Sequence, residues 1–174
     1  MASPKERILE TASKLFQQQG YNSTCINLII QEAEVAKASF YQRIESKDQL
    51  CIAYLQWRHA FWFAELRSAC SQAKKNKKKI AAAFDFLIHM NEKENFRGCS
   101  FLNILSEIGP DQEAILQCIQ DHKNDLRQFF ESDIEDRSRA SHIYLLFEAA
   151  LVESQLFKSN NLIEKAKKIS SNLL

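Results

Sequence analysis

The sequence predicts an all-α protein of about nine helices, on the strength of three observations. Glycine and proline are scarce, with 3 and 2 in 174 residues, which disfavours the tight hairpins of β-sheets. Apolar residues recur at spacings of three and four along most of the chain, as on one face of a helix. Capping and stop signals divide this pattern into segments. We expect a head of three short helices over residues 1–46 and a helical body over residues 47–174.

The composition is that of an ordinary globular protein, with 45% hydrophobic residues, 26% charged residues and a net charge of +1. Any contact with nucleic acid must therefore be local. The chain shows no signal-peptide core and no apolar run near the ~20 residues that cross a bilayer. Its five cysteines never form a C-x-x-C arrangement. We expect a reduced, cytoplasmic location and no membrane partner.

Several kinds of chemistry are not expected. Three glycines are too few for glycine-rich phosphate loops or dinucleotide fingerprints, and no H-E-x-x-H or G-x-S-x-G motif occurs. The four histidines show no metal-ligand spacing. We expect no cofactor, no metal site and no enzymatic activity.

The first helix is marked at both ends. Ser3, Pro4 and Glu6 form a capping-box pattern with proline at the first helical position. Gly20 is the expected stop. One apolar face lies between them, made of Ile8, Leu9, Ala12, Leu15 and Phe16.

Residues 24–50 hold three further helical signals in close succession. Thr24 is the expected cap of a two-turn helix, and the turn Ala33-Glu34-Val35 follows it, because the apolar stripe restarts out of phase at Val35. A second short helix carries Phe40, and Ser46 to Gln49 reads as a capping box that opens a long helix. Two helices joined by a three- to four-residue turn have the layout of a helix-turn-helix.

The segment AEVAKASFY from Ala33 to Tyr41, followed by SKDQL from Ser46 to Leu50, resembles the DNA-reading segment of TetR-family transcriptional regulators. The similarity extends over about residues 4–55 and includes Gly20 and Thr24. It implies that the second short helix enters the major groove. Gln42 would pair with adenine, and Tyr41 and the helix starts at Thr24 and Lys47 would contact phosphates. The implied DNA-binding residues are Thr24, Lys37, Ser39, Tyr41, Gln42, Arg43 and Lys47.

Three features depart from the family pattern. Glu34 occupies a turn position where the family has glycine, so we expect a positive φ at a cost of roughly 1 kcal/mol. Ala36 replaces a capping serine. Residues 1–50 carry six basic and six acidic residues, whereas a DNA-binding module is usually basic. We expect DNA binding of modest affinity.

The body is predicted from apolar spacing. A helix over about 47–73 carries the seam Leu50, Tyr54, Trp57, Phe61 and Ala64, and a lysine-rich loop over 74–79 follows. Shorter helices are expected over 80–91, 98–109 and 111–134. Five aromatic residues could line a pocket for a small hydrophobic or aromatic effector, or could be close-packed core. These are Tyr54, Trp57, Phe61, Phe84 and Phe101.

Cys99 follows Arg97 and precedes a helix start, two features that favour a thiolate. It is a candidate redox or electrophile sensor. The alternative is a small buried apolar residue.

The C-terminal region is the second informative feature. Residues 143–152, IYLLFEAALV, are apolar nearly all round, so the far side should meet another molecule. We expect a two-fold homodimer whose interface includes Tyr144, Phe147, Leu151, Leu162 and Ile169. The sequence thus predicts a homodimeric repressor that an effector releases from a palindromic operator; the alternative is a helical binding module that no longer reads DNA.

Overall fold

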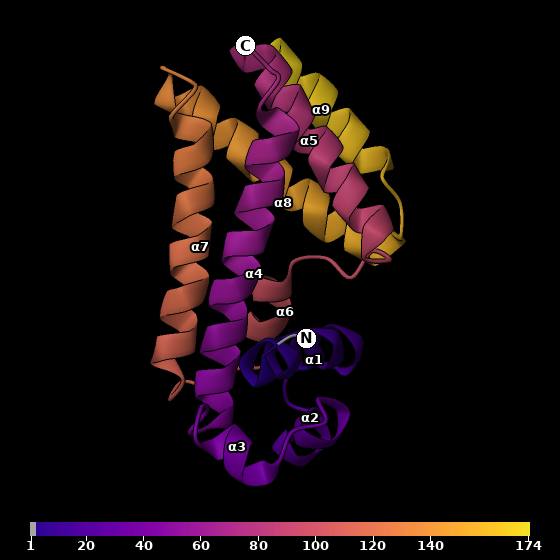
Figure 1. The fold of residues 1–174 in the computed structure, drawn as a ribbon. Coiled ribbons are helices and arrows are strands. Elements are labelled where there is room, and N and C mark those ends of the chain that lie inside the picture. Colours follow the sequence, from indigo (N-terminus) through magenta and orange to yellow (C-terminus); the bar gives the residue numbers. More distant parts are fainter. Residues whose placement is uncertain (1–2) are drawn as a thin grey trace. The chain divides into compact units, whose positions relative to one another are not determined.

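The computed structural model describes residues 3–174, and Figure 1 shows the chain. The described residues form nine helices and no strand, which confirms the predicted all-α class. The helices are α1 (Pro4–Gln19), α2 (Ile26–Glu32), α3 (Lys37–Tyr41), α4 (Lys47–Cys70), α5 (Asn76–Lys93), α6 (Ser100–Leu105), α7 (Glu113–Glu131), α8 (Arg137–Phe157) and α9 (Asn161–Asn172).

The chain folds into two compact units. One comprises the chain up to Ala60 together with Ser100–Gln120, and the other comprises Phe61–Cys99 and Asp121–Leu174. The helices α4 and α7 each contribute residues to both units. The predicted boundary between residues 46 and 47 stays a prediction, and residues 1 and 2 of the expected head lie outside the described residues.

The ends of α1 are those that the sequence predicts. The Ser3 hydroxyl accepts a hydrogen bond from the Glu6 backbone N–H at 3.2 Å, and the Glu6 carboxylate accepts from the Ser3 N–H at 2.7 Å. The helix ends at Gly20, whose φ of 90° favours glycine. The predicted apolar face is buried, and α1 packs on α2 and α3.

The predicted seam of α4 is correct only in its first half. Leu50 and Tyr54 are buried, whereas Trp57 is 38% exposed and Ala64 is also exposed. In the second half of α4 the buried side chains are Trp62, Phe63, Leu66 and Cys70. The buried face shifts because the first half belongs to one compact unit and the second half to the other.

The lysine-rich loop, predicted over residues 74–79, is shorter than predicted. The helix α5 begins at Asn76, so residues 76–79 form its first turn. The Asn76 side chain donates to the Asp133 carbonyl oxygen, and the Lys79 ammonium pairs with the Asp133 carboxylate. These two contacts stabilise a helical turn that the charge pattern alone does not favour.

The helices α5, α8 and α9 pack on one another in the second compact unit (Figure 1). Asp136 caps α8 by accepting from the backbone N–H groups of Ser138 and Arg139. Phe147 lies in the core of this unit, with its ring 5.4 Å from the ring of Phe84. On the outside, α8 exposes an apolar stripe of Leu145, Val152 and Leu156, in agreement with a helix that is apolar on several sides.

Candidate nucleic-acid interface

The turn between α2 and α3 has the geometry that the sequence predicts. Glu34 has a φ of 51°, the left-handed conformation for which glycine is usual. Its backbone is held by two hydrogen bonds, from its own N–H to the Gln31 carbonyl at 3.1 Å and from the Arg7 guanidinium to its carbonyl at 3.2 Å. The turn therefore keeps the conformation without the glycine.

The short helix α3 has one buried side and one exposed side. Phe40 is 0% exposed, and α3 contacts α1. Ala36 precedes the helix and provides no side-chain cap, as predicted. The side chains of Lys37, Tyr41, Gln42 and Arg43 are exposed. This places four of the seven predicted DNA-binding residues on the exposed side of residues 37–43.

Thr24 differs from the prediction. The residue that precedes α2 is Cys25, and no side chain caps the helix. The Thr24 side chain is fully buried, and its hydroxyl donates to the Gly20 carbonyl at 2.7 Å and accepts from the Gln19 amide at 3.1 Å. The predicted cap is wrong, because this hydroxyl joins the end of α1 to the start of α2 and presents no surface to a phosphate.

Three other predicted residues have internal contacts. The Arg43 guanidinium donates to both the carbonyl and the hydroxyl of Ser39, each at 2.8 Å. The Lys47 ammonium donates to the Asn22 carbonyl at 3.3 Å and lies 4.4 Å from the centre of the Tyr21 ring. Ser39 and Lys47 are half-buried. Arg43 and Lys47 are thus held in place at the two ends of the segment that joins α3 to α4.

A partly buried polar network of Tyr21, Asp48 and Gln112 adjoins the start of α4. The Tyr21 hydroxyl donates to the Asp48 carboxylate, and the Gln112 amide donates to that carboxylate at 2.8 Å and to the Tyr21 oxygen at 3.2 Å. Burial, followed by the Asp48 carboxylate, raises the pKa of Tyr21. The phenol therefore stays protonated and can donate to Asp48 at physiological pH.

Glu107, which follows α6, is a functional candidate that the sequence analysis missed. Its carboxylate accepts from the backbone N–H groups of Tyr21 at 3.1 Å and Asn22 at 2.7 Å. Its carbonyl accepts from the Asn22 amide at 2.8 Å. These contacts join the α1–α2 turn to the end of α6. No local motif marks a contact over more than 80 residues, so only an alignment or a structure could find it.

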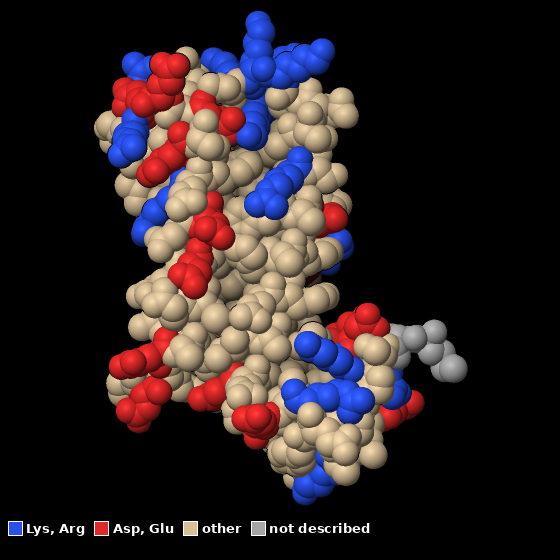
Figure 2. Space-filling model, turned by 60° about the vertical axis from the view of Figure 1, so that its left-hand side comes forward, with Lys and Arg blue, Asp and Glu red and all other residues tan. Residues whose placement is uncertain are grey.

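Figure 2 shows both basic and acidic side chains on one face, with wide uncharged areas between the charged groups. This distribution agrees with the net charge of +1. A DNA contact would therefore depend on a few local cations rather than on a broad basic surface.

The predicted effector residues are mostly core. Tyr54, Phe84 and Phe101 are at most 3% exposed. The Tyr54 ring packs edge-to-face on Phe16 at 5.4 Å. Phe61 is half-buried, so it lies at the edge of the core rather than at its centre. An effector pocket lined by these five residues stays a prediction.

Cys99 is buried and lies beside a charged pair. The Lys123 ammonium is 3.5 Å from the Cys99 sulfur and pairs with the Glu148 carboxylate at 2.6 Å. Burial opposes the charge on Lys123, but the neighbouring sulfur and carboxylate outweigh it and raise the pKa of Lys123. The role of Cys99 as a sensor stays a prediction. All five cysteines are free thiols.

Two of the predicted dimer-interface residues belong to the protomer core. Phe147 is 0% exposed and Leu151 is buried, so neither presents surface to a second molecule. Tyr144 is half-buried beneath the Arg127 guanidinium, which lies 5.1 Å from its ring centre. Leu162 and Ile169 of α9 are exposed, as an interface requires. The spacing of apolar residues predicts that both sides of α8 are apolar, but it does not determine which side faces the protomer core.

Residues 3–174 contain neither a candidate metal site nor a candidate membrane span. No group of three or more histidine, cysteine or acidic side chains in this range is arranged to hold a metal ion. No helix in the same range has the length and apolarity needed to cross a membrane.

Comparison with known proteins agrees with this geometry. Residues 8–54 match the family described as bacterial regulatory proteins, tetR family. The uncharacterized HTH-type transcriptional regulator YuxN of Bacillus subtilis is 36% identical over 66 residues, which are 38% of this chain and 23% of YuxN. An uncharacterized HTH-type transcriptional regulator in the lacX 3′ region of Lactococcus lactis is 25% identical over 130 residues, 74% of this chain and 66% of that protein.

The likeness extends to the fold of the whole chain. The crystal structure of SCO4454, a TetR-family transcriptional regulator from Streptomyces coelicolor, superimposes with a TM-score of 0.81, at 24% identity, over 98% of this chain and 93% of that one. The fold and the reading segment together define a helix-turn-helix regulator. Residues 8–54 thus match the tetR family of bacterial regulatory proteins, and the chain has the fold of TetR-family transcriptional regulators.

Proposed function

We propose that the chain is a repressor that binds a palindromic operator as a homodimer and is released by a small hydrophobic or aromatic effector. One observation supports DNA reading above all. The turn at Glu34 sets α3 with Phe40 buried and with Lys37, Tyr41 and Gln42 exposed. Side chains on the exposed side of such a helix can meet base edges and phosphates.

The side chains divide into two roles in this proposal. Lys37 and Gln42 contact bases, because a glutamine amide matches the donor and acceptor of adenine. Tyr41, Arg43 and Lys47 contact phosphates, which position the protein without reading sequence. Thr24 takes no part through its side chain, since its hydroxyl is buried.

Release requires that the effector favours a conformation in which the two heads no longer fit successive major grooves. The contacts of Glu107 with Tyr21 and Asn22 support this step. They attach the α1–α2 turn of the head to the end of α6, so a displacement of α6 would move the head. Exposed Leu145, Val152 and Leu156 of α8 support the dimer.

The test is a titration of the protein on DNA flanking its own gene and on scrambled DNA at several salt concentrations. Gln42→Ala should lose discrimination between the two DNAs, because a two-pronged base contact discriminates by about 1–3 kcal/mol. Tyr41→Phe should weaken binding to both DNAs alike. Gln18→Ala, the same substitution on an exposed position of α1, is the control and should bind as wild type. Wild-type affinity that does not change with salt would contradict the proposal.

A further inference from the structure

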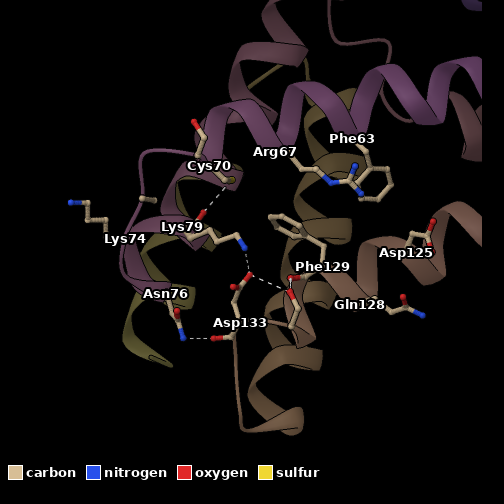
Figure 3. Close-up of a pocket in the computed structure, with 13 residues that line it drawn as sticks. Phe63, Arg67, Cys70, Lys74, Asn76, Lys79, Asp125, Gln128, Phe129 and Asp133 are labelled. Carbon is tan, nitrogen blue, oxygen red and sulfur yellow. Dashed lines mark hydrogen bonds and ion pairs between the residues drawn. The ribbon is translucent and has the colours of Figure 1, made fainter.

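A cleft of about 700 Å³ lies in the second compact unit, separate from the predicted aromatic pocket. It is lined by the C-terminal half of α4, the start of α5 and the end of α7 (Figure 3). Its volume is in the range of small-molecule sites, about 300–1,000 Å³.

Two aromatic rings provide the apolar part of the lining. Phe63 is buried and Phe129 is half-buried. In Figure 3 the Phe129 ring lies between the side chains of Lys79 and Arg67, and the Lys79 ammonium is 5.0 Å from the Phe129 ring centre. A flat aromatic ligand could therefore stack on Phe129.

The charged side chains of the lining leave one cation available. Lys79 is paired with Asp133, and Lys74 extends away from Phe129 (Figure 3). Asp125 also lines the cleft and is engaged by another residue. The Arg67 guanidinium lies 5.5 Å from the Phe63 ring centre, and residues 3–174 provide no carboxylate partner for it.

The charged side chains that line the cleft determine which ligand charge fits it. Because Lys79 is paired with Asp133 and Lys74 extends away from Phe129, Arg67 provides the single positive charge to which a ligand can bind. A monoanion would neutralise this charge, whereas a phosphate ester would exceed it. The paired N–H groups of an arginine guanidinium match the two oxygens of a planar carboxylate.

We propose that this cleft binds an aromatic monocarboxylate, whose ring stacks on Phe129 and whose carboxylate pairs with Arg67. That such a ligand acts as the effector rests on the proposed function; binding to the cleft does not.

The test is calorimetric titration of the full chain with 2-naphthoate and with its neutral analogue 2-naphthamide. Wild type should prefer the carboxylate by about tenfold or more, since hydrogen bonds to charged groups are the stronger ones. Arg67→Gln should remove this preference. Lys78→Gln makes the same charge change on an exposed position of α5 outside the cleft, and should keep it. Equal affinity for the two compounds, no binding of either, or a preference that survives Arg67→Gln would overturn the proposal.

A second measurement separates this inference from the proposed function. DNA binding of Arg67→Gln should equal that of wild type, and 2-naphthoate should weaken DNA binding only when Arg67 is present. A protein that binds naphthoate through Arg67 but never binds DNA would contradict the repressor and leave the cleft site standing. A protein that binds DNA but does not bind naphthoate would contradict the cleft site and leave the proposed repressor standing.

Discussion

Gly20 and Glu107 fit each other at the join between the α1–α2 turn and the end of α6. A Cβ atom on Gly20 would lie 2.7 Å from Oε1 of Glu107, closer than real Cβ contacts. The same carboxylate accepts hydrogen bonds from the next two backbone N–H groups, those of Tyr21 and Asn22. The missing side chain at position 20 is what lets the carboxylate approach the backbone.

Gly20→Ala should therefore destabilise the protein for two reasons. The new Cβ would displace Glu107, and the φ of 90° is unfavourable for alanine. We expect a loss of about 1–3 kcal/mol in the free energy of unfolding, measured in urea. Gly109→Ala is the matched control, because nothing lies within 4 Å of its Cβ position. Equal stability of the two variants would show that the fit at Gly20 is unimportant.

Alkaline pH should weaken the fold through Cys51. Burial, followed by the charge of Asp48, raises the pKa of this thiol from 9.0 to about 12. Above pH 9 the unfolded chain releases a proton that the native thiol keeps, so each rise in pH favours unfolding. The slope should approach about 1.4 kcal/mol per pH unit up to pH 12. The raised pKa of Tyr21 acts in the same direction but only above pH 10.

Urea unfolding at pH 8, 9 and 10 measures this slope. Cys51→Ala removes the titrating group. The variant should be less stable than wild type at pH 8 because of the cavity, and its free energy of unfolding should fall less steeply between pH 9 and 10. Parallel pH dependence of the two proteins would exclude Cys51 as the cause.

The elements that the sequence predicted correctly have local causes. The capping box at Ser3 and the stop at Gly20 depend on residues within one turn of the helix end. The positive φ of Glu34 is expected from the glycine that the TetR pattern has at this position in the turn. The reading segment could be identified for the same reason, because its residues are continuous in the chain.

The contacts that the sequence did not predict are long-range. Glu107 meets Tyr21 across 86 positions, and its carboxylate resembles any exposed acid in the sequence. The choice between Leu151 and its neighbour Val152 as the outward residue of α8 depends on which side meets α5 and α9. Spacing on one helix contains no information about its partners.

Leu156 provides a test of the dimer that leaves the core intact. Its side chain is 67% exposed in the protomer, so a charge there costs little unless another molecule covers it. Leu156→Glu should give folded monomers in sedimentation at micromolar concentration, and binding to the operator should be lost. Leu105→Glu, on α6 and 40% exposed, is the control and should remain dimeric. A wild-type protein that sediments as a monomer would contradict the proposed homodimer.

Glu34→Gly should improve both stability and DNA binding. The φ of 51° is costly for glutamate and free for glycine, although glycine also increases the entropy of the unfolded chain. We expect a net gain of about 0.5–1 kcal/mol in the free energy of unfolding. The Arg7 contact should persist, because it uses the Glu34 carbonyl oxygen and not the side chain. Removal of an exposed acid from the turn before α3 should also raise the affinity for DNA, most clearly at low salt.

Glu34→Gln separates the two effects, since it removes the charge but keeps the unfavourable backbone conformation. This variant should bind DNA more tightly than wild type without a gain in stability. Urea unfolding and DNA titration of the three proteins give both quantities. A Glu34→Gly protein less stable than wild type would show that the side chain, rather than the backbone, holds the turn.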